Sequence, residues 1–155
     1  MLRSNGKNSR LENDSHSSSA IAAPGVVSPA GSTPIARRAG CQRVQTVFHL
    51  IAADPQQQQT ALTIAENLTE DDSVEIGDIA IVAQADGIEP LTADGDGSDM
   101  VESLLEKGIS VKACSNTLEL KDLAESDLVE GVEPVPSGGG ELTRLQSEGY
   151  AYIRP

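Results

Sequence analysis

The chain has 155 residues, enough for one domain of ordinary size and an appendage. Residues 1–43 carry six Lys and Arg against two acids, whereas residues 44–155 carry 5 basic and 22 acidic side chains, a net charge of −17. Because such a surface repels nucleic acid and anionic membranes, we expect neither as a partner.

Residues 1–43 are expected to be disordered. They contain eight serines and three prolines without strand or helix periodicity, so they cannot bury enough apolar surface to offset the entropy of ordering. Arg37-Arg38 and the tripeptide ending at Cys41 imitate export signals, but the apolar segment that such signals need is missing. We therefore expect a cytoplasmic protein. A further hypothesis is that translation begins at Val44, which GTG can encode, so that residues 1–43 are not native.

From residue 44 onward, strands and helices alternate. An apolar strand at 44–51 is followed by a helix that runs to about residue 69, with Asp54 as N-cap, Pro55 at the first helical position and Gln57 completing a capping box. A second strand at 76–82 precedes a long loop at 84–98. The next helix, at 99–107, ends at Gly108.

The third strand, at 109–113, leads directly into Cys114. Asn116 and Glu119 have capping-box spacing and predict a helix with Asn116 as its N-cap. A short turn at 126–129 and a fourth strand at 132–135 follow.

The last predicted helix opens at Ser137 and three glycines, runs to residue 146 and ends at Gly149, before a strand at 150–153. About five strands separated by helices predict an α/β fold, a three-layer α/β/α sandwich with a mainly parallel sheet. The functional crevice of such a sheet lies at the carboxyl ends of its strands.

Cys114 is the candidate reactive residue. It lies at a strand-to-helix junction, near the positive end of a helix dipole, where the thiolate is favoured. Lys112, on the same strand face, would add to this effect, as would a pairing with His49 of the first strand. The alternatives are that Cys114 is a small buried hydrophobe and that His49 is a satisfied core residue.

Other residues are candidates for lining the same crevice. Gly138 and the two glycines after it could offer backbone N–H groups to an anion, although the lysine of a phosphate-binding loop is absent. The acidic loop at 94–99 departs from a calcium-binding loop at its sixth and twelfth positions, so we predict no metal site there. We also predict no cofactor. The remaining crevice candidates are Asp54, Asp86, Gly87 and Ser137.

The domain is poor in aromatic residues and in lysine. A core without Trp and with one Phe buries little area per side chain, so we expect self-association. The dispersed acidic charge is typical of a protein solvated for high salt, which screens self-repulsion, and we expect a halophilic source.

Four separated phrases of residues 44–155 resemble the DsrE/DsrF-like family, and most closely its small uncharacterised prokaryotic branch with halophilic archaeal members. The resemblance implies a parallel sheet of about five strands and assembly into trimers or hexamers. The phrases are Thr46-Val-Phe-His-Leu50, Lys112-Ala-Cys-Ser-Asn-Thr-Leu118, Gly131-Val-Glu-Pro-Val-Pro-Ser137 and Glu141-Leu-Thr-Arg-Leu-Gln-Ser-Glu-Gly-Tyr-Ala-Tyr-Ile153.

The best-understood relatives carry sulfur as a persulfide on one cysteine within sulfur-relay complexes. The resemblance therefore suggests that Cys114 acts as a persulfide carrier, with Asn116 at the helix that stabilises its thiolate and with sulfur-relay proteins as partners. The residues around Cys114 depart from those of the carrier subunits, which leaves this activity a hypothesis. The alternative is an oligomeric module without thiol chemistry that binds a small ligand or a protein.

Overall fold

The computed structural model describes residues 43–155, so the disorder predicted for residues 1–43 and the hypotheses on Cys41 and the arginine pair lie almost wholly outside it. The described part is built on one five-stranded sheet in the order β4-β3-β2-β1-β5, in which every neighbouring pair is parallel. Its strands are β1 (Val44–Leu50), β2 (Ile76–Ala83), β3 (Ser110–Cys114), β4 (Glu133–Val135) and β5 (Ala151–Ile153).

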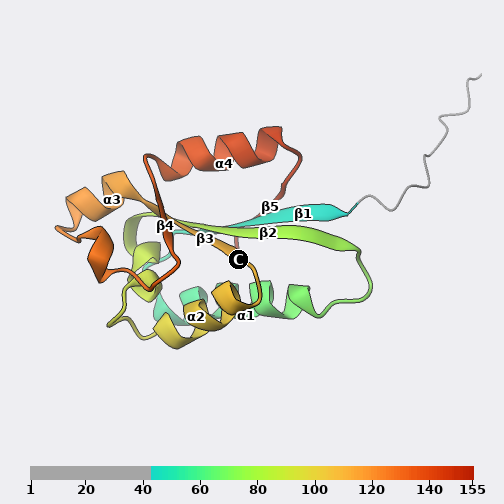
Figure 1. Ribbon diagram of the computed structural model, residues 1–155, viewed down its shortest axis with the longest axis horizontal. Coiled ribbons are helices and arrows are strands. Elements are labelled where there is room, and N and C mark those ends of the chain that lie inside the picture. The colour runs from blue at the N-terminus through green and yellow to red at the C-terminus, as the bar shows by residue number, and fades with distance from the viewer. Residues whose placement is uncertain (1–42) are drawn as a thin grey trace, which may run out of the picture. The chain divides into compact units, whose positions relative to one another are not determined.

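Helices cover both faces of this sheet (Figure 1), which confirms the predicted three-layer α/β fold. Helices α1 and α2 lie against one face and α4 lies against the other. The helices are α1 (Pro55–Thr69), the 3-10 helix η1 (Ala85–Leu91), α2 (Ser98–Glu106), α3 (Ser115–Leu120), the 3-10 helix η2 (Glu125–Asp127) and α4 (Gly138–Ser147). Among the described residues, no helix is both long enough and apolar enough to cross a membrane.

The path of the chain explains why α4 has one face of the sheet to itself. Strands β1 to β4 are added in one direction, and α4 then carries the chain back to place β5 beside β1. Because all five strands are parallel, their carboxyl ends lie along one edge of the sheet. Residues that follow β1, β2, β3 and β4 in the sequence can therefore meet there.

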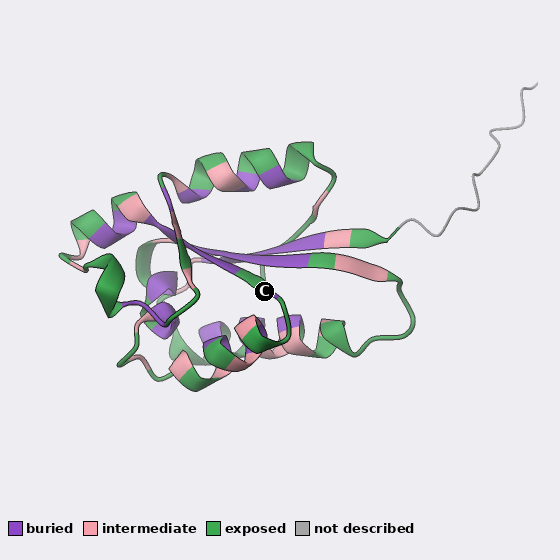
Figure 2. Ribbon diagram, viewed as in Figure 1, coloured by how far each residue is buried: buried purple, intermediate pink, exposed green. Residues whose placement is uncertain are grey.

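The central strands are buried on both faces, as their almost continuous apolar sequences require (Figure 2). Phe48, Ile81 and Val111 pack toward α1 and α2. The residues that face α4 are smaller, and Val47 and Val82 pack against Leu142 and Leu145. The period of two along each strand thus assigns alternate residues to opposite layers.

Several local predictions are confirmed. Asp54 caps α1, because its side chain accepts from the backbone N–H groups of Gln56 and Gln57. Gly108 and Gly149 follow α2 and α4 with φ of +86° and +97°, the left-handed conformation that ends a helix.

One prediction for this part of the chain is wrong. The segment at 84–98 is not a long loop, because η1 occupies its first half. A Cβ on Gly87 would lie 2.3 Å from the carbonyl oxygen of Leu50. The glycine lets the backbone of η1 pack directly on the end of β1, and sequence periodicity does not report such a close approach.

Candidate functional site

Three polar or reactive residues and the first glycine of α4 gather at the carboxyl ends of the strands, on the face covered by α4. His49 lies near the end of β1, Gln84 directly follows β2, and Cys114 ends β3. Gly138 begins α4, and a Cβ built on it would lie within 3.3 Å of both the Cys114 Cβ and the Gln84 side chain. Strand order therefore brings together residues that are as many as 89 positions apart.

Cys114 is itself the N-cap of α3, which corrects the predicted capping box. The helix begins at Ser115, and its N-cap lies two residues before the expected Asn116, which is instead the second helical residue. At an N-cap the side chain faces the N–H groups of the second and third helical residues. Here that side chain is a thiol, and no cap bond of ordinary length reaches it.

The surroundings of Cys114 favour its thiolate. Burial raises the pKa of the thiol, but the backbone N–H of Gly138, the hydroxyl and N–H of Thr117 and the N–H of Asn116 act against burial and leave the pKa lower than usual. These donors come from the amino ends of two different helices, α4 and α3. The polar N–H and O–H groups that face this sulfur therefore act more strongly on its thiolate than desolvation does, although no cap bond of ordinary length reaches it.

Thr117 has a hydroxyl whose orientation is set by a second contact. Its Oγ1 accepts from the backbone N–H of Ala85 at 3.1 Å, which leaves its proton available to the Cys114 sulfur. Ala85 has φ of +52°, a left-handed conformation that is uncommon for a residue other than glycine. The turn after β2 thus holds the hydroxyl that faces the thiol.

Lys112 does not act on Cys114 in the way predicted. It lies on the same face of β3, but its Nζ is 2.6 Å from Glu133 Oε2 and 3.4 Å from Glu141 Oε1. Glu141 is in the first turn of α4, so the buried lysine ties that turn to β3. Its effect on the thiol is indirect, through the position of α4.

His49 does not contact Cys114 either. Its Nδ1 lies 2.7 Å from the Tyr152 hydroxyl, and its Nε2 lies 2.9 Å from Gln84 Nε2. Burial lowers the pKa of His49, and the positive charge of Arg154 lowers it further, so both favour the neutral ring. With both nitrogens engaged, the imidazole is a fixed structural group and not a base for the thiol.

The other crevice candidates are used within the fold. Asp54 caps α1 and lines a different pocket, and Ser137 caps α4 by accepting from the Gly140 N–H at 3.3 Å. Asp86 pairs with Lys121 at 2.8 Å. Of the five residues predicted to line the crevice, Gly138 alone acts on Cys114.

Three residues at the site, Gln84, Thr117 and Tyr152, were not predicted. Thr117 could have been found, because it is the third residue after an N-cap cysteine, a position that faces the cap. Gln84 carries a weaker signal, since it continues the alternation of Ala80 and Val82 past the end of β2. Tyr152 carries no signal, because its neighbour His49 is 103 residues away.

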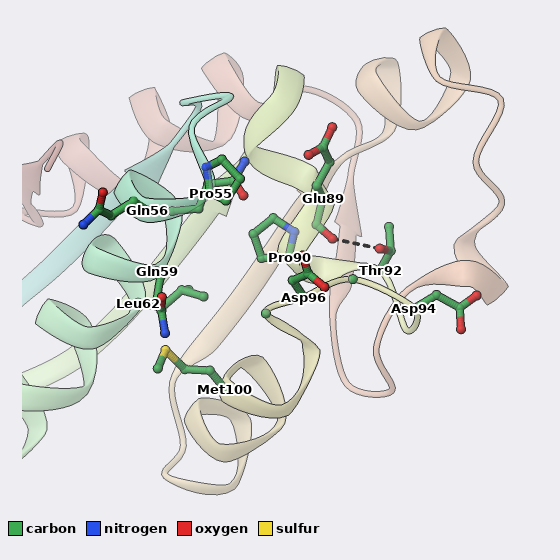
Figure 3. Close-up of a pocket in the computed structure, with 13 residues that line it drawn as sticks. Pro55, Gln56, Gln59, Leu62, Glu89, Pro90, Thr92, Asp94, Asp96 and Met100 are labelled. Carbon is green, nitrogen blue, oxygen red and sulfur yellow. Dashed lines mark hydrogen bonds between the residues drawn. The ribbon is translucent and has the colours of Figure 1, made fainter.

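A pocket of about 730 Å³ lies on the other side of the sheet from Cys114, between α1, η1 and the start of α2 (Figure 3). Three carboxylates of its wall, those of Glu89, Asp94 and Asp96, give it an acidic character, and Cys114 does not line it. In the described part of the chain, no group of three or more His, Cys, Asp or Glu residues is arranged to hold a metal ion. The remaining lining residues are Pro55, Gln56, Gln58, Gln59, Leu62, Pro90, Thr92, Gly95, Gly97 and Met100.

Comparisons with known proteins agree with the fold. The solved structure of MTH1491, a protein of unknown function from Methanobacterium thermoautotrophicum, is 37% identical, with a TM-score of 0.66, over 72% of this chain and 99% of that one. The ychN protein from E. coli matches at 17% identity and a TM-score of 0.60, over 74% of this chain and 99% of that one. BT1422, a protein of unknown function from Bacteroides thetaiotaomicron, matches at 17% identity and a TM-score of 0.59, over 72% of this chain and 94% of that one.

No curated protein matches the chain. The model of the DsrE/DsrF-like family matches residues 45–155, which include every strand and helix described above except the first residue of β1. That match carries the assignment: the chain belongs to the DsrE/DsrF-like family.

Proposed function

We propose that this protein carries sulfur as a persulfide on Cys114. The observation that supports the proposal most directly is the set of donors around the sulfur, which come from the amino ends of α3 and α4 and lower the pKa of the thiol despite its burial. Burial alone would raise this pKa, so these groups supply the thiolate character that sulfur transfer needs. Membership in the family agrees with this role.

The proposed step is a thiol exchange without net oxidation. The Cys114 thiolate attacks the outer sulfur of a donor persulfide, R–S–SH. A new S–S bond forms on Cys114, the donor S–S bond breaks, and the donor leaves as R–S⁻, which takes up a proton from water. The same N–H and O–H groups of α3 and α4 that favour the thiolate would then face the bound persulfide.

Access to the sulfur is a requirement of the proposal. Cys114 is 5% exposed, and it lines none of the pockets described here. Gly138 packs between the Cβ of Cys114 and the side chain of Gln84. The transfer therefore requires the amino end of α4 or the Gln84 side chain to move aside when the donor approaches.

The test is incubation of the reduced protein, in high salt, with a low-molecular-weight persulfide donor, followed by intact-mass measurement. We expect a gain of one sulfur in the parent and in Cys41→Ser, and none in Cys114→Ser. The same result in all three proteins, or resistance of folded Cys114 to both sulfur and alkylation, would contradict the proposal and make Cys114 a packing residue.

One observation favours the alternative, a ligand-binding module without thiol chemistry. The pocket of about 730 Å³ between α1, η1 and α2 has a volume typical of small-molecule sites. A binding module would lose no function in Cys114→Ser. Ligand-induced thermal stabilisation that is equal in the parent and in Cys114→Ser would favour this alternative over the carrier.

We also propose that the protein assembles with itself, as a trimer or hexamer, and acts with sulfur-relay proteins in the cytoplasm of a halophile. Support for assembly comes from the edge strand β5, all three residues of which are exposed. An exposed strand edge is a template for pairing with another chain. Light scattering after size-exclusion chromatography in high salt tests the assembly, which a monomeric mass would contradict.

A further inference from the structure

We propose that Gln84 is a positioning residue for Cys114, held by a chain of contacts from Tyr152 through His49 and itself holding the donors of both α3 and α4 against the sulfur. The inference rests on the proposed function for its biological purpose. The geometry that it concerns can be tested on the thiol alone. Neither the family resemblance nor the sequence motifs assign a role to this residue.

Hydrogen bonds anchor the Gln84 carboxamide. Gln84 Nε2 donates to the Nε2 of His49 at 2.9 Å, and His49 Nδ1–H donates to the Tyr152 hydroxyl at 2.7 Å. This assignment of protons follows because a neutral imidazole has one acceptor nitrogen and one donor nitrogen. The chain of bonds joins β2 to β1 and β5, and it leaves the carboxamide a single supported orientation.

Gln84 also packs against the start of α4. A Cβ on Gly138 would lie 2.6 Å from Gln84 Oε1, 3.3 Å from Gln84 Cβ and 3.3 Å from Cys114 Cβ. The carboxamide and the cysteine therefore pack against the same backbone atoms, and only glycine leaves room for both. The separation between the Gly138 N–H and the sulfur is set partly by how closely Gln84 lets α4 approach.

Gln84 is linked to α3 through its neighbour in the chain. The residue after it, Ala85, donates its N–H to Thr117 Oγ1 from a left-handed backbone conformation. Such a conformation is strained for a residue with a side chain and persists only where the surroundings enforce it. Gln84 and Ala85 together thus contact one donor group from α4 and one from α3.

The charged groups near this face are the same in the parent and in every variant that changes only Gln84 or Gly138; His49→Phe alone removes a titratable group, the imidazole that Gln84 and Tyr152 contact. Lys112 of β3 is paired with Glu133 of β4 and Glu141 of α4, and Arg154 follows β5. None of these side chains is bonded to Gln84. A change in the thiol on substitution of Gln84 would therefore report a change in donor geometry, since no charge is added or removed.

The experiment measures the alkylation rate of Cys114 by iodoacetamide from pH 5 to pH 10, with Cys41→Ser as the parent, and takes the thiol pKa from each profile. Gln84→Met keeps the volume of the side chain but cannot donate to His49, and Gln84→Ala removes the carboxamide, with its Oε1 contact to Gly138, while keeping the Cβ. We expect both to raise the pKa by about one unit, which lowers the thiolate fraction at neutral pH several-fold.

Two further variants complete the test. His49→Phe should shift the profile in the same direction, and the double variant with Gln84→Met should shift it no further, because both break one chain. Gly138→Ala should displace Gln84, whereas Gly139→Ala is the matched control, since its Cβ would meet only Ser137 Oγ at 4.0 Å. Circular dichroism and urea unfolding check that each variant is folded.

The outcomes separate this inference from the proposed function. If Gln84→Met and Gln84→Ala are folded and their profiles superimpose on that of the parent, the inference is wrong even if the parent accepts sulfur. If the profiles shift as expected but the parent accepts no sulfur, Gln84 still positions the thiol, and the persulfide role is the part that fails.

Discussion

At the scale of single residues, the site depends on donors that surround one sulfur. Cys114 is buried, and burial alone would disfavour its thiolate. The compensating groups are mostly backbone N–H groups, which no side-chain substitution removes without also moving a helix. Thr117 is the exception, because it also contributes a side chain.

Thr117 gives the clearest prediction at this scale. Thr117→Val keeps the size of the side chain but removes the hydroxyl, so we expect the pKa of the Cys114 thiol to rise by about one unit, as loss of a hydrogen bond to a charged group implies. Thr117→Ser keeps the hydroxyl and should stay close to the parent. The measurement is the alkylation rate against pH, and equal profiles for Val and Ser would refute the role of the hydroxyl.

At the scale of elements, the position of α4 determines the site. This helix crosses the sheet to reach β5, and its first turn supplies both Gly138 and Glu141. Leu142 and Leu145 pack on the sheet, and Lys112 adds a buried ionic tie between β3 and Glu141. Because a charge with few water contacts is costly when its partner is lost, this tie is expected to be more important than a surface ion pair.

The matching prediction compares two lysines. Lys112→Met should lower the free energy of unfolding by about 1–3 kcal/mol, less than a fully buried pair, because Glu141 keeps its bond to Arg144. Lys107→Met is the control. Its pairs with Glu66 and Glu70 are more exposed, so water and salt screen them and their loss should lower stability less than loss of the Lys112 tie. Urea unfolding at pH 7 measures both, and equal losses would show that the Lys112 tie is unimportant.

The same tie predicts a pH dependence. The hydrogen bond from Arg144 and the charge of Lys112 lower the pKa of Glu141 below its ordinary value. Its contribution to stability is therefore present above the unfolded-state pKa and is lost as the pH falls through the lower, folded-state pKa. Lys112→Met should lose less stability than the parent between pH 6 and pH 3, and an identical acid dependence would argue against this account.

At the scale of the whole molecule, charge is the dominant property. Residues 44–155 have a net charge of −17, and only five cations oppose it. Repulsion among dispersed acids destabilises the compact state at low ionic strength, and salt screens it with a Debye length that falls from about 10 Å at 0.1 M to about 3 Å at 1 M.

We therefore expect the free energy of unfolding to rise between 0.1 M and 1 M NaCl, measured with urea so that the denaturant adds no ions. Substitution of two exposed acids of α2, Glu102→Gln together with Glu106→Gln, should raise stability at 0.1 M and weaken the salt dependence. A parent whose stability is independent of salt would remove the physical basis for the proposed halophilic source.

The sequence by itself determined the local order of the fold. Periodicity and cap residues such as Asp54, Gly108 and Gly149 located the strands and most helix ends, because these signals act within one turn or one strand. They also placed Cys114 at a strand end. The N-cap of α3 was misplaced by two residues, since Cys114 occupies the capping position that was expected for Asn116.

Only the tertiary structure decided which residues act on the sulfur. The parallel sheet and the return crossing of α4 bring Gln84 and Gly138 against Cys114, while Lys112 turns to Glu133 and Glu141, and His49 to Tyr152 and Gln84. The hydrogen-bonded pairs among these residues lie 21 to 103 positions apart in the sequence. Periodicity tells which face a side chain occupies but not which neighbour it meets, because that depends on strand order and on how closely the layers pack.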